Sequence, residues 1–174
     1  MPASADPVLA TVLDTPIGPL SLLARDGTLV AGGFTGDPAS LHARLHRSLR
    51  TGKLVPARSG DLAWLVKPLR DYFGGDLTAI DGLPVYQPGS ASRQRLWGLL
   101  RAVPVGGTVS YTQLATMAGQ PRAPRAAGAA CAANMIAPVV PCHRAVRGDG
   151  NLCGYYYGLE RKEWLLRHEG ALSA

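Results

Sequence analysis

A turn-rich stretch at residues 78–91, TAIDGLPVYQPGSA, divides the chain into two halves of different character. It is crowded with glycine, proline and serine and shows little periodicity of apolar residues. Such stretches commonly connect compact domains. We therefore expect a first domain at residues 1–80, a linker at 81–91 and a second domain at 92–174.

The two halves also differ in charge. Residues 1–90 carry eight Lys or Arg against eight Asp or Glu, whereas residues 91–174 carry ten against four, so the whole net charge of +6 lies in the second half. A basic excess confined to one domain predicts a polyanionic partner, and we favour nucleic acid. The alternative is a surface that merely aids solubility.

The composition excludes several classes of protein. With 47% apolar and 17% charged residues the chain is globular, and no window approaches the roughly 20 apolar residues of a membrane span. The N-terminus lacks the basic start and long apolar core of a signal peptide, so we expect a soluble, cytoplasmic protein with no membrane partner. Three cysteines without a CxxC pair, and four histidines at other spacings, argue against a disulfide framework and a structural metal.

The first half combines strand and helix signals. Apolar runs around the turn signal ARDGT predict a β-hairpin, preceded by a turn at TPIGP. Leu41, Leu45 and Leu49 form the stripe of a short amphipathic helix, and a second helix is expected to begin at an Asp61 cap and end at the glycines 74–75.

The second half is predicted to be mostly helical. Ser92 is expected to cap one helix, and Ser110 a second that Gly119 closes. A short turn, GQPRA, then leads to a helix beginning near Pro124, where proline is tolerated. A pair of helices joined by a tight glycine-containing turn is typical of helix-turn-helix proteins.

The second helix of this pair carries unusually small side chains. Every residue from 126 to 133 is Ala, Gly or Cys. The helix therefore either packs tightly against another helix or fits a narrow groove, with Arg125 projecting at its start.

The segment VVPCHR places a thiol, an imidazole and a guanidinium side by side after a short apolar run. Pro141 restricts the backbone at the entry to Cys142. A neighbouring imidazole raises the thiolate fraction of a cysteine, and the natural link from His143 to the sulfur is one water molecule. An acid should orient His143, and spacing leaves four candidates open: Asp149, Glu160, Glu163 and Glu169. A buried inert thiol is the alternative reading of Cys142.

Taken together, these motifs resemble the O6-alkylguanine-DNA alkyltransferases, which move an alkyl group from guanine onto a cysteine. The matching elements are PCHR, an upstream Asn, SYTQLA, an Arg-Ala-x-Gly helix and ERKEWLLRHEG. The resemblance is continuous from about Ser92 to Gly170 and extends weakly to TPIGPL and DYFGG.

The resemblance implies a role for each matching residue. The implied catalytic residues are Cys142 as alkyl acceptor, His143 as base through a water, Glu169 as the acid that orients it, Asn134 as support of the turn and Tyr111 as hydrogen-bond donor to the guanine. The implied DNA-binding residues are Tyr111, Arg125 as the finger that replaces the flipped nucleotide, and the helix positions Ala126, Ala127, Gly128 and Ala129. The implied substrate pocket comprises Pro141, Ala145, Tyr155, Tyr156 and Tyr157.

The resemblance also implies a fold and a function. It predicts an N-terminal α/β domain with an RNase H-like antiparallel sheet, and a mostly α, winged-helix-like C-terminal domain with a helix-turn-helix. It predicts direct-reversal repair by single-turnover transfer from O6-alkylguanine in flipped-out DNA, with O4-alkylthymine as a second substrate. The protein would act as a bacterial-type, nucleoid-associated monomer on the minor groove of double-stranded DNA, without cofactor or metal.

One loop departs from the family pattern. Residues 154–158 read GYYYG, where the family places two small residues between tyrosine and glycine. Tyr156 and Tyr157 either narrow the alkyl pocket or turn outward, and Cys153 stands where glycine is common. A lesion-sensing DNA-binding protein with a blocked pocket, or a specialised alkyltransferase for an unusual adduct, therefore remains an alternative. A Cys–His hydrolase is a further alternative, but no motif indicates an oxyanion hole.

Overall fold

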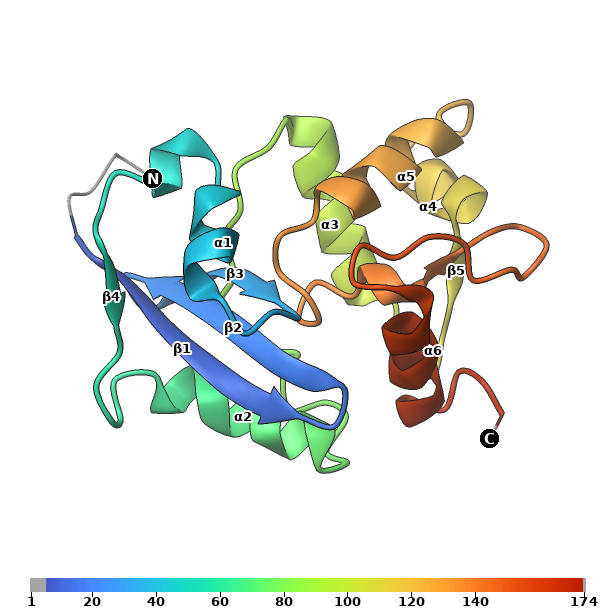
Figure 1. Ribbon diagram of the computed structural model, residues 1–174. Coiled ribbons are helices and arrows are strands. Elements are labelled where there is room, and N and C mark those ends of the chain that lie inside the picture. Colours follow the sequence, from blue (N-terminus) through green and yellow to red (C-terminus); the bar gives the residue numbers. More distant parts are fainter. Residues whose placement is uncertain (1–5, 174) are drawn as a thin grey trace. The chain divides into compact units, whose positions relative to one another are not determined.

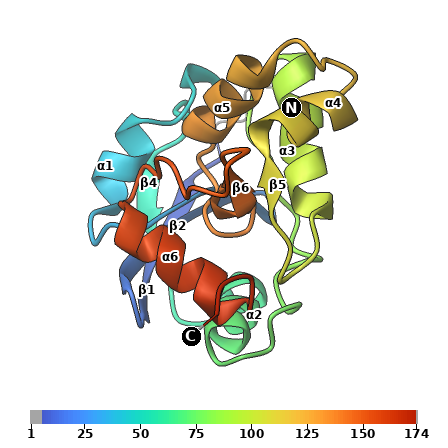
Figure 2. The ribbon, with the colours of Figure 1, turned by 90° about the vertical axis from the view of Figure 1, so that its right-hand side faces the viewer.

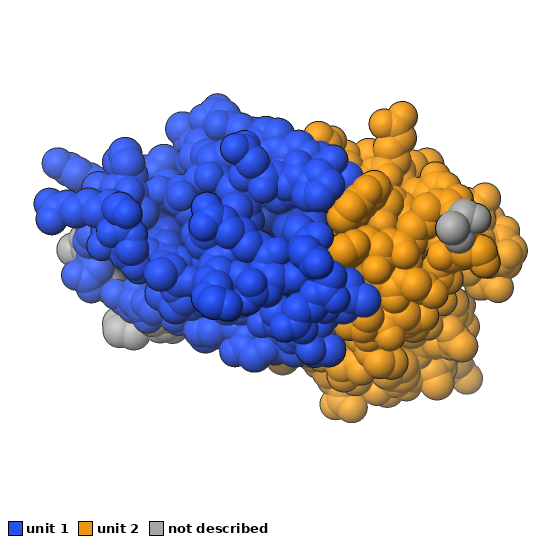
Figure 3. All heavy atoms as spheres, turned by 90° about the horizontal axis from the view of Figure 1, so that it is seen from below, with its two compact units in different colours: residues 1–88, 135–139 blue, residues 89–134, 140–174 orange. Residues whose placement is uncertain are grey.

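The computed structural model describes residues 6–173. The chain forms two compact units, one of residues 1–88 and 135–139 and the other of residues 89–134 and 140–174 (Figure 3). The short segment 135–139 thus belongs to the first unit, although it lies deep in the second half of the sequence. The predicted linker at 81–91 stays a prediction.

The first unit is built on a four-stranded sheet (Figure 1). Its strands are β1 (Val8–Thr15), β2 (Gly18–Arg25), β3 (Thr28–Gly33) and β4 (Leu54–Pro56), in the order β3-β2-β1-β4. The first three strands are antiparallel and confirm the predicted hairpin, but β4 pairs parallel with β1. The expected antiparallel sheet is therefore a mixed sheet, because the chain passes through a helix before it adds the fourth strand.

The helices of the first unit are α1 (Pro38–Ala43), the 3-10 turn η1 (Arg47–Leu49) and α2 (Ala63–Phe73). The single helix predicted from the leucine stripe is interrupted, because His46 leaves the helical region and its Nδ1 accepts a hydrogen bond from the Ser48 amide. The predicted Asp61 cap is also wrong. The Asp61 carboxylate accepts a hydrogen bond from the Arg58 amide instead. The N-cap position of α2 is Leu62, and no side chain caps the helix there.

The segment 135–139 pairs with β3. The Gly32 amide donates to the Met135 carbonyl at 2.8 Å, and the Ala137 amide donates to the Gly32 carbonyl at 2.9 Å. A β-carbon at Gly32 would lie only 2.4 Å from the Ala137 oxygen, so this close approach requires glycine.

The second unit is mostly helical. It contains α3 (Ala91–Ala102), β5 (Val109–Ser110), α4 (Tyr111–Met117), α5 (Pro124–Ala133), the 3-10 turn η2 (Cys142–Arg144), β6 (Ala145–Val146) and α6 (Leu159–His168). Helices α3, α4 and α5 pack against one another (Figure 2). The coarse prediction of an α/β first half and a helical second half is confirmed.

Serine side chains cap two helices of this unit, α3 and α4. Ser110 begins α4 with a reciprocal capping box to Gln113, as predicted. Helix α3 is capped by Ser90 and not by the predicted Ser92, whose hydroxyl donates to Gln120 instead. The short strand β5 pairs with β6 in the register Val109↔Ala145, which brings the start of α4 beside the turn η2.

Among residues 6–173, no helix combines the length and apolar character that crossing a bilayer would need.

Candidate active site

Cys142 lies at the first position of the 3-10 turn η2, immediately after a buried proline. Its amide donates to the Val140 carbonyl at 2.9 Å, and the Ala145 amide closes the turn on the Cys142 carbonyl. The residue is partly exposed although its neighbours are buried. Cys142 is therefore the one residue of the turn η2 that is not fully buried.

Asn134 is the C-cap residue of helix α5, and its side chain hydrogen-bonds with the residues that form the turn η2. Its Nδ2 donates to the Val140 carbonyl at 2.9 Å and to the Cys142 sulfur at 3.2 Å. Burial raises the pKa of the Cys142 thiol, and the Asn134 hydrogen bond and the Lys162 charge offset part of that rise. The resting sulfur is thus a thiol at neutral pH. It ionises more readily than an equally buried cysteine that lacks these two neighbours.

His143, Arg144 and Glu169 form a buried network behind this thiol. His143 Nε2 lies 3.0 Å from Glu169 Oε1, and Arg144 binds both carboxylate oxygens at 2.9 Å. A further Arg144 nitrogen donates to the Val103 carbonyl at 2.5 Å. Of the four candidate acids, the structure thus places Glu169 on His143.

Burial and pairing fix the protonation of this network. Burial lowers the pKa of His143, and the Glu169 carboxylate offsets this only in part, so the imidazole is neutral at pH 7. Burial alone would raise the pKa of Glu169, but hydrogen bonds from His143 and Arg144, and their charges, bring it below its ordinary value. Since Nε2 faces a carboxylate, we assign the proton to Nε2. Nδ1 is buried and has no protein hydrogen-bond partner in the described part of the chain.

Tyr111, at the start of α4, meets the other cysteines of the chain. Its hydroxyl hydrogen-bonds with the Cys153 thiol, and burial together with the nearby thiols raises its pKa well above the ordinary value. Cys131, on α5, has its pKa raised to about 12 by burial. Cys131 is therefore an inert packing thiol, as the sequence suggested.

The aromatic loop at residues 155–157 brings its three rings into edge-to-face contact. The ring of Tyr157 lies edge-on to Tyr155 at 5.9 Å and to Tyr156 at 4.9 Å between centroids. Tyr156 is 64% exposed, whereas Tyr155 and Tyr157 are partly buried. Tyr156 therefore turns outward, and Tyr157 is the bulky departure from the family pattern that faces the protein. Cys153, two residues before this loop, has φ +58°, a left-handed conformation that favours glycine.

The small helix α5 exposes one side. Arg125 and Ala129 are exposed, Ala126 and Gly128 are partly exposed, and Ala127 is buried. Packing explains a small side chain at the buried Ala127 but not at Gly128, where an added β-carbon would meet the Tyr111 ring at an ordinary contact distance of 4.0 Å. The exposed side of α5 therefore carries only small side chains after the guanidinium of Arg125 at its start.

Comparison with known proteins agrees with this geometry. The methylated-DNA–protein-cysteine methyltransferase of Mycolicibacterium paratuberculosis is 38% identical over 90% of this chain and 89% of its own length. This chain belongs to the methylated-DNA–protein-cysteine methyltransferase family. Residues 91–171 match the family described as 6-O-methylguanine DNA methyltransferase, DNA binding domain.

Other family members show the same likeness. The methyltransferase of Salmonella typhimurium is 51% identical over 104 residues, which span 60% of this chain and 61% of that protein. The match with this relative thus spans less than two thirds of its length. The crystal structure of Mycobacterium tuberculosis OGT in complex with DNA superposes with a TM-score of 0.79, at 34% identity over 94% of both chains.

The sequence did not lead us to two residues of the candidate active site described above. Arg144 was noted only as a cation in PCHR, yet it holds both oxygens of Glu169. Lys162, inside ERKEWLLRHEG, was assigned no role, although its side chain is completely buried. The signal that could have found it is a lone lysine among the apolar positions of α6.

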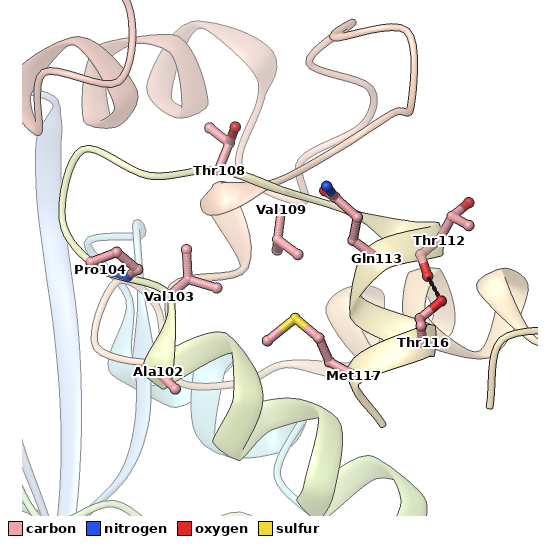
Figure 4. Close-up of a pocket in the computed structure, with 9 residues that line it drawn as sticks. All are labelled: Ala102, Val103, Pro104, Thr108, Val109, Thr112, Gln113, Thr116 and Met117. Atoms are coloured by element: carbon pink, nitrogen blue, oxygen red, sulfur yellow. Dashed lines mark hydrogen bonds between the residues drawn. The ribbon is translucent and has the colours of Figure 1, made fainter. Parts of the chain in front are cut away.

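The second unit also contains a cavity of about 510 Å³, apart from this site (Figure 4). It lies between the end of α3, strand β5 and helix α4, and its lining residues are Ala102, Val103, Pro104, Thr108, Val109, Thr112, Gln113, Thr116 and Met117. None of the predicted catalytic or pocket residues lines it.

Proposed function

We propose that the protein repairs alkylated DNA by transferring the alkyl group from O6 of guanine to Cys142, once per molecule, as a methylated-DNA–protein-cysteine S-methyltransferase. The observation that carries the proposal is the position of the Cys142 sulfur, which accepts a hydrogen bond from Asn134 at 3.2 Å and belongs to the residue directly before the buried His143 that pairs with Glu169. This arrangement joins a nucleophile, a neutral base and an orienting acid.

The first step is removal of the thiol proton. Neutral His143 is a base, and its Nδ1 is the nitrogen left to receive a proton, because Nε2 faces Glu169. One water between the Cys142 thiol and Nδ1 would carry the proton from sulfur to imidazole. Glu169 then stabilises the imidazolium that forms.

The second step is a displacement at the alkyl carbon. The thiolate forms the carbon–sulfur bond as the carbon–O6 bond breaks, and the departing guanine takes a proton from the Tyr111 hydroxyl. The raised pKa of Tyr111 keeps it protonated at neutral pH, as a donor must be. The Tyr111 phenolate that remains then regains a proton from the His143 imidazolium, so overall the alkyl group ends on sulfur and one proton ends on guanine, with no cofactor or metal involved. The thioether is stable, so the protein acts once.

The partner in this proposal is double-stranded DNA. The alkyl carbon is inaccessible inside a duplex, so the nucleotide must be flipped out. We assign α5 to the minor groove, with Ala126, Ala127, Gly128 and Ala129 at the groove and Arg125 replacing the flipped base in the stack. The protein would act as a monomer near the nucleoid of a bacterial cytoplasm.

The pocket in this proposal lies between the turn η2 and the aromatic loop. Pro141 and Tyr155 would line it, and the Cys142 and Ala145 carbonyls would accept the exocyclic amine of guanine. Both carbonyls already accept one hydrogen bond, and each has a second lone pair. Tyr157 would narrow the alkyl end and favour methyl, whereas the exposed Tyr156 would contact the substrate from the rim. O4-methylthymine is a second expected substrate.

Two finer assignments accompany this proposal. We propose that the first unit is RNase H-like and the second winged-helix-like, because three strands of the sheet are antiparallel and α4 and α5 form a helix-turn-helix pair.

A repair assay tests the proposal. A duplex is prepared with O6-methylguanine inside a restriction site, so that only repaired DNA is cut. We expect the cut fraction to equal the molar ratio of protein to DNA, and Cys142→Ser to bind the duplex without restoring any cutting. Binding by the wild-type protein with no restored cutting would instead indicate a lesion sensor.

A further inference from the structure

Lys162 is a buried cation that the proposed mechanism does not use. Its side chain, on α6, is 0% exposed, and within residues 6–173 it forms no ion pair with a carboxylate. Burying an unpaired ammonium is costly, and such groups usually lose their charge or find a compensating partner. Burial does lower the pKa of Lys162, and nearby thiols offset part of that effect.

Its hydrogen bonds go to two segments of the site. Nζ donates to the Ala145 carbonyl at 2.6 Å and to the Gly154 carbonyl at 3.4 Å. Ala145 is the residue whose amide closes the turn η2 on the Cys142 carbonyl. Gly154 directly precedes the aromatic loop. One side chain therefore ties the turn that carries the acceptor to the loop that faces it.

The groups around Lys162 are mainly thiols. Cys142 on η2, Cys131 on α5 and Cys153 before the aromatic loop all interact electrostatically with its ammonium, as does His143. The one thiol of these three that the proposed reaction deprotonates is Cys142. When that proton leaves, Lys162 and the sulfur become a buried pair of opposite charges.

We propose that Lys162 is a positioning residue that holds the aromatic loop on the acceptor turn and supplies the positive charge that stabilises the Cys142 thiolate. This inference rests on the proposed function only for the use of the thiolate. The ionisation itself is a property of the protein without DNA. The two can therefore fail separately.

The test uses full-length protein carrying Cys131→Ser and Cys153→Ser, so that Cys142 is the only thiol. Its reaction with iodoacetamide is followed across pH for this background, for Lys162→Met and for Lys162→Arg. We expect Lys162→Met to slow alkylation at pH 7 by about tenfold and to move the profile to higher pH, since thiolate is the reactive form. Lys162→Arg should restore part of the rate, and Lys67→Met, at an exposed lysine, should change nothing.

An unchanged profile in folded Lys162→Met overturns the inference, whatever the outcome of the DNA repair assay. If the Lys162 variants do not fold, the coupling between Lys162 and Cys142 is measured in protein that keeps Lys162. In protein with ¹⁵N-labelled lysine, the Lys162 Nζ resonance should shift with the titration of Cys142, and Cys142→Ser should abolish that shift. A Lys162 resonance that does not respond to the titration of Cys142 also overturns it.

Discussion

Glu169 accepts hydrogen bonds from two consecutive residues of the PCHR motif, His143 and Arg144. Its carboxylate both orients the imidazole and raises its basicity. We expect Glu169→Gln to reduce the single-turnover rate of alkyl transfer by roughly 100-fold, because a misoriented, less basic imidazole is a poor proton acceptor. Quenched-flow sampling of methyl transfer from labelled duplex measures this rate.

The matched control is Glu163→Gln on α6, the helix that ends directly before Glu169, where the Glu163 carboxylate is half exposed and pairs with Arg167. This variant should transfer at the wild-type rate. Equal rates for Glu169→Gln and Glu163→Gln would show that the buried acid has no part in the reaction.

His143 also makes stability depend on pH. Because its pKa is lowered in the folded protein, the unfolded chain binds the proton more readily as pH falls through the ordinary value of 6.5. Stability is therefore full above pH 6.5 and declines below it, by at most about 1.4 kcal/mol per pH unit for one proton.

Urea unfolding between about pH 7.5 and 5.5 measures this decline, in a range where Glu169 stays ionised in both states. His143→Gln should flatten the profile more than His42→Gln, since His42 is much less buried although burial also lowers its pKa. A wild-type stability that does not fall in this range would contradict the assignment of a neutral buried imidazole.

Sequence reasoning at this scale identified residues with recognisable chemistry but not the residues that support them. Cys142, His143, Asn134 and Glu169 lie together as expected. The contacts of Arg144 and Lys162 were not predictable, because they depend on which carboxylate and which carbonyls the fold brings to them.

At the scale of elements, the exposed side of α5 offers a clear test. We expect Ala129→Leu to weaken binding to duplex DNA about tenfold or more, since an extra side chain does not fit a minor groove roughly 6 Å wide. Ala129 is exposed, so the fold should tolerate the change. Fluorescence anisotropy with a labelled duplex gives the affinities.

The same substitution at Ala39, an exposed alanine of α1 in the first unit, serves as control and should bind normally. If both leucine variants bind like the wild-type protein, α5 is not the helix that enters the groove.

At this scale, the apolar pattern predicted which side chains are buried better than it predicted whether one helix runs without interruption. Leu41, Leu45 and Leu49 are all buried as the stripe required, with exposures of 1–3%. Yet the helix ends at Ala43, because a local hydrogen bond between His46 and Ser48 competes with helical bonding. The caps show the same limit: Ser110 was identified correctly, whereas Ser90 was passed over for a serine two residues later.

At the scale of the whole molecule, the net charge of +6 lies entirely in residues 91–174. Sequence-independent binding should therefore depend on phosphate contacts and on counterion release. We expect affinity for undamaged duplex to fall steeply between about 50 and 200 mM salt. Affinity that does not change with salt would mean that this basic half does not contact the phosphate backbone.

The division into units was the hardest feature to foresee from sequence. The turn-rich residues 78–91 and the change in charge both point to a boundary, but residues 135–139 return to the first unit as a partner of β3. A backbone pairing of this kind depends on the close approach at Gly32 and leaves no periodic signal in the sequence.

The central claim is that the Cys142 sulfur receives the alkyl group. Mass spectrometry of the intact protein, followed by peptide mapping, after incubation with duplex containing O6-methylguanine tests it most directly. We predict a gain of one methyl group on the peptide that contains Cys142, and none on those with Cys131 or Cys153. Restored guanine in the DNA with no added mass on Cys142, or a methyl group on another residue, would contradict it.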